Sequence, residues 1–252
     1  METRSLATQF VEDPINTLIG IAFFALIIFL IYRHHKKKKA AKNKKRQPSE
    51  VTVTISDRVP SFSSGNNHNY GDYEKLISIA KFQNVMNKQY VVFDLETTGL
   101  DADSDQIIEI GAVRVEKGRI TDKYHQMVNP KILIPKAASD KNHITDDMVK
   151  DAPTIDQVLP DFLAFVGSDI LAAHNGGFDA SFLDNACKRH HFAAPEKYFD
   201  TMRLSVYWPN LPNRKLETFL KAAGIHNNDA HRALSDAQCT AELIIKSMDK
   251  IK

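Results

Sequence analysis

From Tyr90 onward, short apolar runs alternate along the chain with longer stretches of amphipathic spacing. The run at 90–96 predicts a buried β-strand, and residues 106–130 predict two more strands joined at the Lys117-Gly118 turn. Further short strands are predicted at 170–175 and 197–204, the second running into a helix. Helical spacing recurs at 144–149, 154–167, 178–191, 215–224 and 231–248. A three-strand meander followed by alternating helices and strands predicts an α/β fold, with helices flanking a mixed sheet.

Three residues predict where these helices begin, bend or end. Thr145 is a suitable N-cap for the helix at 144–149, and acidic residues occupy its first turn. Pro160 lies inside the 154–167 stretch and is expected to kink it or divide it in two. Gly224 is a typical residue for closing the helix at 215–224.

The N-terminal part contains an uncharged apolar stretch of a different length, residues 15–32. It is near the lower end of the ~17–25 residues that a membrane-spanning helix needs. Acids precede it and a strongly basic run follows, which is the reverse of a cleaved signal peptide. A buried core helix is the alternative, but it does not need such flanks. We therefore expect a single transmembrane helix in a bacterial inner membrane, in contact with lipid, with the C-terminal domain in the cytoplasm.

These patterns divide the chain into four parts. The expected parts are a short N-terminal segment (1–14), the transmembrane helix (15–32), a basic run with a flexible linker (33–80) and the folded domain (81–252). The linker is rich in Ser, Asn and Gly and has no apolar period, although 72–83 has the spacing of a short helix leading into the domain.

Charge is distributed very unevenly between these parts. The whole chain has a formal charge of +2, but nine Lys or Arg and no acid lie between Arg33 and Arg46, so the remainder carries −7. From Lys81 onward there are 21 basic and 24 acidic residues. The domain is therefore not a globally basic nucleic-acid-binding module. Its two cysteines, Cys187 and Cys239, lack metal-type spacing and are expected to be core thiols.

Two acids interrupt the first predicted strand immediately after its most apolar part. Side chains at positions i and i+2 of a strand point the same way, so Asp94 and Glu96 converge on one face. A strand end fraying into water would tolerate such a pair. A divalent cation such as Mg²⁺ or Mn²⁺ would also satisfy it, but it needs more than two ligands.

Further acids occur in similar settings. Asp179 lies at the start of a predicted helix, where an N-terminal acid is also common without any function. Asp236 lies in the last helix, five residues after His231. Five helical residues turn ~500°, so the two cannot share a face if both are helical. His231 is therefore expected on the entering loop or first turn, although a lone His is usually a surface or core residue.

The stretches FDLETTGL, HNGGFDASFL and HRALSD, taken in this order, resemble the three motifs of the DEDDh-type 3′–5′ exonuclease family. That family includes proofreading subunits of bacterial DNA polymerase III, ribonuclease T and oligoribonuclease. The resemblance covers about residues 88–249 and implies a ribonuclease-H-like fold. It also implies that the function is hydrolysis of phosphodiester bonds at nucleic-acid 3′ ends.

The resemblance assigns a role to each acid. It implies two divalent ions, with Asp94 bridging both and Glu96 and Asp236 completing the site that binds the attacking water. Asp179 would hold the second ion through water, and His231 would be the general base.

The resemblance also implies a set of substrate contacts. The turn of Thr97, Thr98 and Gly99 would approach the terminal nucleotide, and Leu100 and Phe178 would pack against a base or simply join the core. His174 and Asn175 belong to the same substrate-binding group. His143 departs from the family, because many relatives carry glycine there.

Three functions remain open from the sequence. The first is a 3′–5′ exonuclease on single-stranded DNA. The second is an exoribonuclease on short RNA or RNA ends, because contacts to the 2′-hydroxyl cannot be placed from these motifs. The third is a nuclease-like module that binds nucleic acid without turnover, which the complete set of acids and His231 disfavours.

Overall fold

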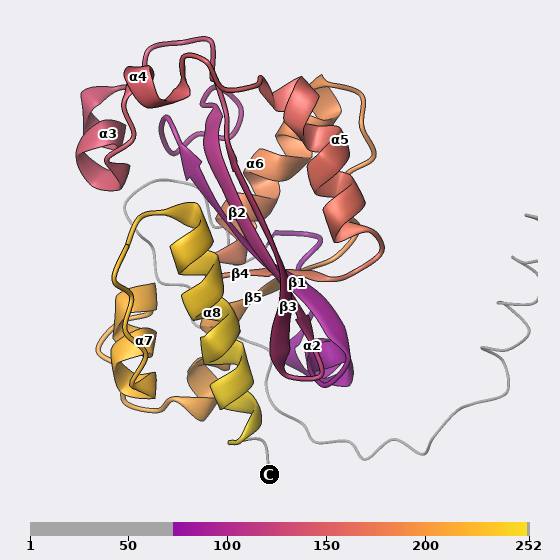
Figure 1. The fold of residues 1–252 in the computed structure, drawn as a ribbon. Helices are drawn as coiled ribbons and strands as arrows, with labels where there is room; N and C mark the ends of the chain where they lie inside the picture. Colours follow the sequence, from indigo (N-terminus) through magenta and orange to yellow (C-terminus); the bar gives the residue numbers. More distant parts are fainter. Residues whose placement is uncertain (1–72, 251–252) are drawn as a thin grey trace, which may run out of the picture. The chain divides into compact units, whose positions relative to one another are not determined.

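A computed structural model describes residues 73–250 of the chain. These residues form a five-stranded mixed sheet with helices on both faces (Figure 1). The mixed α/β fold expected from the sequence is confirmed. The predicted transmembrane helix at 15–32 and most of the predicted linker lie outside the described residues.

The strand order in the sheet is β3-β2-β1-β4-β5. β1 (Gln89–Thr97), β2 (Ile107–Glu116) and β3 (Arg119–Met127) form the antiparallel meander. β4 (Leu171–Ala173) and β5 (Tyr198–Asp200) add on the other side of β1 in parallel. β1 is therefore central, and its carboxyl end lies beside that of β4.

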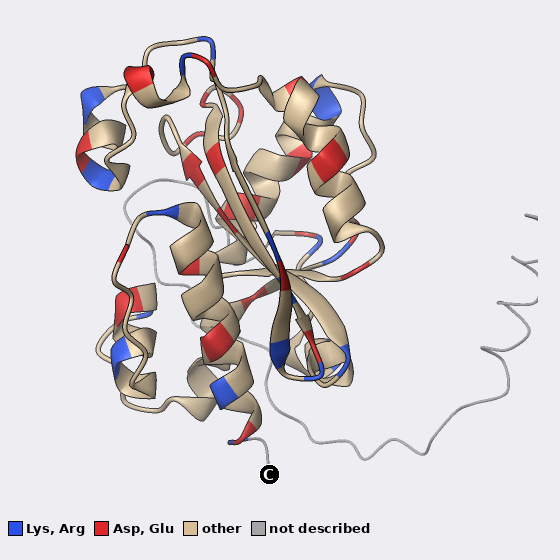
Figure 2. Cartoon of the chain, in the orientation of Figure 1, with Lys and Arg blue, Asp and Glu red and all other residues tan. Residues whose placement is uncertain are grey.

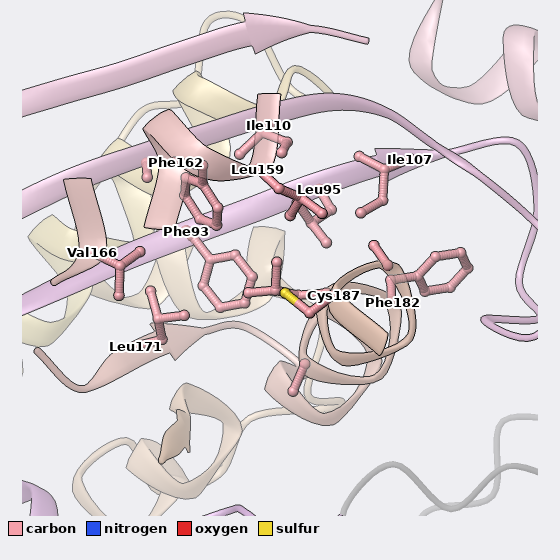
Figure 3. Packing of buried hydrophobic residues seen from close by; sticks show 14 of the residues in the cluster. Phe93, Leu95, Ile107, Ile110, Leu159, Phe162, Val166, Leu171, Phe182 and Cys187 are labelled. Atoms are coloured by element: carbon pink, nitrogen blue, oxygen red, sulfur yellow. The ribbon is translucent and has the colours of Figure 1, made fainter. Parts of the chain in front are cut away.

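Two helical layers cover the sheet. α5 (Ile155–Val166) and α6 (Gly176–Arg189) pack on one face through a cluster of buried side chains that includes Phe93, Phe162 and Phe182 (Figure 3). The opposite face packs against α2 (Ile79–Met86), α7 (Leu216–Ala223) and α8 (Ala233–Met248), together with the 3₁₀ helix η3 (Thr201–Tyr207). The short helices α3 (Lys136–Asn142) and α4 (Asp146–Val149) follow β3 and pack around Ile108 and Ile144.

Alternation along β1 assigns its acids to the face covered by α8. Phe93 and Leu95 belong to the core shared with α5 and α6, whereas Tyr90 and Val92 belong to the core shared with α8. Asp94 and Glu96 have the parity of Tyr90 and Val92, so they point toward α8. Both cysteines are buried free thiols, as the sequence predicts.

Helix α8 approaches this face very closely at Gly111 of β2. A Cβ atom placed on Gly111 would lie 2.1 Å from the backbone nitrogen of Leu234. No side chain fits in that space, so glycine is required by the close contact and not by its own torsion angles. The contact brings the first turn of α8 onto the strand that pairs with β1.

Two local expectations are corrected or explained by the structure. α5 runs through Pro160 as one helix of 12 residues, so the expected division is wrong. The helix loses one backbone hydrogen bond there, but Leu159 and Phe162 on either side of it are fully buried. His143 ends α3 in the left-handed conformation with φ 59°. That torsion angle accounts for the glycine that many relatives carry at this position.

Residues 73–80, which the sequence analysis placed in the linker, pack against the domain. Leu76 forms a parallel bridge to Tyr198 on β5, and the Lys75 ammonium lies 2.6 Å from the Asp184 carboxylate. The Tyr73 hydroxyl donates a hydrogen bond to the same carboxylate. Ile77 and Ile79 are buried. The polar residues before position 73 carry the flexible-linker pattern, and residues 73–80 join the fold through these contacts.

A protein that begins at Lys81 should therefore be less stable than one that begins at Tyr73. The shorter fragment lacks Ile77 and Ile79, and burial is worth roughly 1.5–3 kcal/mol for each fully buried side chain of this kind. Urea denaturation of the two fragments should show a free energy of unfolding lower by about 3 kcal/mol for the shorter one. Equal midpoints for the two fragments would show that residues 73–80 contribute nothing to folding.

Within residues 73–250, no helix has both the length and the apolar character needed to cross a membrane.

Candidate active site

Three carboxylates meet at the carboxyl end of β1. Asp94 and Glu96 project from β1, and Asp236 projects from the first turn of α8. One oxygen of each lies within 4.8 Å of the others. The sequence places Asp236 140 residues or more after the other two, so the contact between α8 and the sheet creates this cluster.

Asp179 approaches the same place from α6. It is 3% exposed, and one of its oxygens accepts a hydrogen bond from the Leu95 backbone nitrogen at 3.1 Å. Leu95 lies between Asp94 and Glu96 on β1, so this bond holds Asp179 beside them, and its negative charge contributes to raising the pKa of Asp94. α6 can begin here because Gly176 allows it to pack against the backbone of Phe199 and Asp200. All four predicted acids therefore lie close together around one small volume. Lys and Arg residues are scattered over the described part of the chain and do not gather in one region of the cartoon (Figure 2).

His231 lies at the rim of this volume, on the loop before α8. The helix begins at Ala233, so the expectation that His231 precedes it is confirmed. Its backbone has φ 64°, an uncommon conformation for a residue with a side chain. The His231 backbone nitrogen donates to Asp236 at 3.1 Å, and Asn227 donates to the other oxygen of that carboxylate. The side chain of His231 is exposed.

Burial and mutual repulsion shift the titration of all four acids. Burial is the largest cause in each case. It raises the pKa of Glu96 to about 8, with further contributions from Asp236 and Glu109. The pKa of Asp179 is raised to about 8, and those of Asp94 and Asp236 are also raised. Removing water disfavours the charged form, and neighbouring carboxylates disfavour it further.

These shifts indicate that a positively charged ligand would stabilise the ionised form of the cluster. Within residues 73–250 no Lys or Arg forms an ion pair with any of the four acids. Oxygen-rich sites of this kind suit hard cations such as Mg²⁺ and Mn²⁺. Asp94, Glu96 and Asp236 fit such an ion both by the type of ligand and by their spacing, and Asp179 adds a further carboxylate beside them.

The sequence analysis missed several residues that surround the acids. Glu109 lies opposite Glu96 on β2 and is fully buried, and it is clamped by Arg232. Asn142, at the end of α3, hydrogen-bonds to Glu96, and the nearby Lys141 charge also lowers the pKa of Glu96. An acid between isoleucines in the run IIEIGAV was a visible signal for Glu109. No comparable signal marked Asn142, because α3 reaches the site only through the fold.

The predicted substrate-binding turn is held in place by hydrogen bonds within the protein. The Thr98 hydroxyl donates to Asp105 at 3.1 Å, and Thr98 is 2% exposed. The Thr97 hydroxyl donates to the Gly99 carbonyl oxygen at 2.6 Å. A Cβ on Gly99 would lie 2.3 Å from a carboxylate oxygen of Asp105, so glycine is needed for packing there. Leu100 is 54% exposed, which leaves it accessible to a nucleotide.

The other residues predicted to bind substrate, His174, Asn175 and Phe178, have different surroundings in the structure. His174 uses both ring nitrogens inside the protein, Nδ1 with the Thr201 hydroxyl at 2.9 Å and Nε2 with the Arg214 carbonyl oxygen at 2.7 Å. It ties β4 to distant segments through both ring nitrogens, and its contact with substrate stays a prediction. Asn175 caps α6 with φ 60°. Phe178 is partly buried and packs on Phe182, with ring centroids 4.8 Å apart.

Comparison with known proteins decides the family. The family model for exonucleases (RNase_T) matches residues 91–244, which is more than half of the chain. The chain belongs to this exonuclease family. All four acids and His231 lie within the matched residues.

Several relatives are DNA polymerase III proteins of the PolC type. The chain is 42% identical over 165 residues to the one from Clostridium perfringens and 41% identical over 162 residues to the one from Bacillus subtilis. These matches cover 65% and 63% of this exonuclease chain but only 11% of each relative. The chain therefore spans about a tenth of the length of these relatives.

Solved structures show the same fold. A structure of exonuclease X in complex with 5′-overhanging duplex DNA is similar at a TM-score of 0.52 and 29% identity, covering 64% of this chain and 91% of that one. Escherichia coli exonuclease I in complex with a dT13 oligonucleotide gives a TM-score of 0.56 at 19% identity, over 65% of this chain and 40% of that one. The second likeness concerns the fold alone.

The crowded acids predict an unusual dependence of stability on pH. Groups whose pKa is raised by folding stabilise the protein fully below the unfolded value and lose that contribution as the pH rises through the folded value. For Glu96 and Asp179 this window runs from about pH 4 to about pH 8. Without divalent ions, the melting temperature should fall across it. Added Mn²⁺ should restore it, because an ion that binds only the folded state stabilises that state.

Thermal melts from pH 5 to pH 8, with chelator and with Mn²⁺, provide the measurement. Asp94→Asn removes one of the repelling charges and should flatten the fall. Asp169→Asn serves as the control, because Asp169 pairs with Arg114 away from these acids. A chelated protein that gains stability from pH 5 to pH 8 would contradict the raised pKa values.

Proposed function

We propose that this protein is a metal-dependent 3′–5′ exonuclease that removes nucleotides from the 3′ ends of single-stranded DNA. The observation that carries the proposal is the approach of Asp94, Glu96 and Asp236 within 4.8 Å, with Asp179 beside them. Family membership supports the reaction class. The complete set of acids disfavours the reading as a module that binds without turnover.

The four carboxylates would hold two divalent ions, Mg²⁺ or Mn²⁺. Asp94 would be the shared ligand, Glu96 and Asp236 would complete one site, and Asp179 would contribute to the other. Such ions supply a nucleophilic water and stabilise charge on the attacking and leaving oxygens of a phosphodiester.

The remaining steps fall to the chain's own side chains. The imidazole of His231 would take the proton from the attacking water, and its place at the rim gives it access to solvent for releasing that proton. The backbone bond from His231 to Asp236 holds this base close to the acids. Leu100 follows the end of β1 and is 54% exposed, and it would contact the terminal nucleotide together with Phe178.

DNA is the preferred substrate on the strength of the relatives. The PolC-type proteins are DNA polymerases, and exonuclease X was solved with duplex DNA that has a 5′ overhang. The net negative domain has no broad basic face, so binding would depend on local contacts and on the ions. RNA of the same sequence is the alternative substrate that an assay must include.

Asp94→Ala and Asp94→Asn should both abolish degradation of a 5′-labelled single strand in Mg²⁺ or Mn²⁺. Each removes a ligand that no neighbouring group replaces, and each relieves repulsion, so the metal-free protein should remain at least as stable. Gel assays with DNA and RNA, labelled at either end and repeated with chelator, measure the loss and the polarity. A wild-type rate for Asp94→Ala would sink the assignment.

His231→Ala provides the contrasting variant. It should lower the rate by roughly 10²–10⁴-fold while calorimetry still detects Mn²⁺ binding, because the four acids remain. Its deficit should shrink at higher pH, where more hydroxide is available. Loss of Mn²⁺ binding in His231→Ala, with retention in Asp94→Ala, would reverse the roles.

We also propose that residues 15–32 anchor the protein in a bacterial inner membrane as a single-pass helix. The uncharged stretch and the basic run after it support this location, with the nuclease domain in the cytoplasm. The basic residues at 33–46 would then lie against anionic lipid.

Fractionation of cells that produce the full chain should place it in the membrane pellet. An alkaline phosphatase fusion after Lys252 should be inactive and a green fluorescent fusion should be bright, because both would lie in the cytoplasm. Recovery of the full chain in the supernatant after high-salt washing argues against the anchor. An active phosphatase fusion argues against the orientation.

A further inference from the structure

Glu109 is a fifth carboxylate beside the proposed catalytic acids, and it has different partners. It lies on β2 directly opposite Glu96, and its side chain is 1% exposed. One oxygen lies 2.8 Å from Nη2 of Arg232 and 2.6 Å from Nε2 of His125. The other oxygen accepts from the backbone nitrogen of Ala233 at 3.1 Å. Both oxygens are therefore occupied by donors.

The bond from the Ala233 backbone nitrogen to Glu109 caps the N-terminus of α8. The first nitrogens of a helix have no partner inside it, and a side chain just before the helix normally supplies one. Arg232 occupies that position and makes no such bond. Glu109 supplies the acceptor instead, from a different element of the fold. Its negative charge also lies at the positive end of the helix dipole.

The clamp acts on the segment that carries the proposed base and one acid. His231 immediately precedes Arg232, and Asp236 follows one turn into α8. The backbone nitrogens of His231 and Ala233 donate to Asp236 and Glu109 respectively, so Arg232 lies between two fixed points. His231 also has a left-handed backbone, which must be imposed by its surroundings. Gly111 leaves the space for this close contact.

The same contacts keep Glu109 from acting as a metal ligand. It is not a member of the group formed by Asp94, Glu96 and Asp236. Arg232 and His125 occupy the oxygen that faces them, and Ala233 occupies the other. Glu109 therefore contributes negative potential and a fixed geometry to the site while its oxygens are engaged elsewhere.

We propose that Glu109 and Arg232 are positioning residues, which fix the start of α8 on the sheet and thereby place His231 and Asp236 over the other acids. Neither residue touches the reacting atoms. The proposal rests on the proposed function for its catalytic consequence, but its structural part concerns two backbone amides that can be observed directly.

Amide hydrogen exchange of the full-length protein, with Mn²⁺ and with chelator, provides the readout that does not need activity. Arg232→Ala should increase exchange at the His231 and Ala233 amides by tenfold or more. Arg114→Ala is the matched control. Like Arg232, Arg114 pairs with a carboxylate, that of Asp169. It lies on β2 and donates to the Phe165 carbonyl oxygen on the face covered by α5. The Arg114→Ala variant should therefore leave the His231 and Ala233 amides protected.

Kinetics then separate positioning from general loss of stability. A displacement of about 1 Å costs on the order of 10²-fold in rate, so Arg232→Ala should lower kcat by that order with little change in KM. In the wild-type protein, both Nε and Nη2 of Arg232 donate to the Glu109 carboxylate. Arg232→Lys keeps the charge but loses this paired contact, so it should recover part of kcat. In a His231→Ala background, the further loss caused by Arg232→Ala should be at least tenfold smaller, because the base is already absent.

Three results overturn the proposal. Unchanged exchange at His231 and Ala233 in Arg232→Ala shows that no clamp exists, whatever the activity. Equal losses of kcat in the two backgrounds, within about twofold, together with an unchanged Mn²⁺ affinity in Arg232→Ala, show that Arg232 acts through neither His231 nor Asp236. A loss of kcat in Arg114→Ala that matches Arg232→Ala assigns the effect to stability. An inactive wild-type protein with the expected exchange pattern would refute the proposed function and leave the clamp intact.

Discussion

Repulsion among buried carboxylates is the constraint on which this structure depends. Asp94, Glu96, Asp179 and Asp236 converge on one volume, and burial and proximity raise the pKa of each. This repulsion destabilises the folded state, and burial of the large apolar cores on both faces of the sheet offsets it. The acids come from β1, α6 and α8, so the repulsion is spread over elements that are each held by their own hydrophobic contacts.

The sequence predicted the parts of the fold whose signals are local. Periodicity gave the meander, the alternation of later elements and the position of the last helix, because burial of one face leaves a repeating pattern. The division expected at Pro160 was wrong, because the propensity of one residue was outweighed by the burial of Leu159 and Phe162. The sequence pattern also placed residues 73–80 in the linker, since a short segment with two charged residues resembles a linker until its partners on β5 and α6 are known.

In the candidate site, too, the residues with a local sequence signal were predicted and those without one were missed. Motifs in chain order were enough to choose the four acids and His231, and the structure brings the acids together. His174 was assigned to substrate by its place in a motif, and the motif gave no sign that its ring nitrogens contact Thr201 and Arg214. Glu109, Asn142 and Asn227 were missed because each matters through a contact across the fold. Residues that support a site from a distance therefore need the tertiary structure to be found.

The bridge between Leu76 and Tyr198 has a consequence for how the molecule behaves among its own copies. A sheet that ends in an unpaired strand offers free backbone groups to any other strand, which favours edge-to-edge aggregation. The segment around Leu76 lies along β5 and covers part of that edge. At the opposite edge, β3 carries exposed charged side chains, which make pairing with a strand of a second chain unfavourable. These residues are Arg119, Asp122 and Lys123. The two edges are thus protected in different ways: a chain segment covers one, and charged side chains line the other. Both arrangements oppose edge-to-edge aggregation of this domain at high concentration.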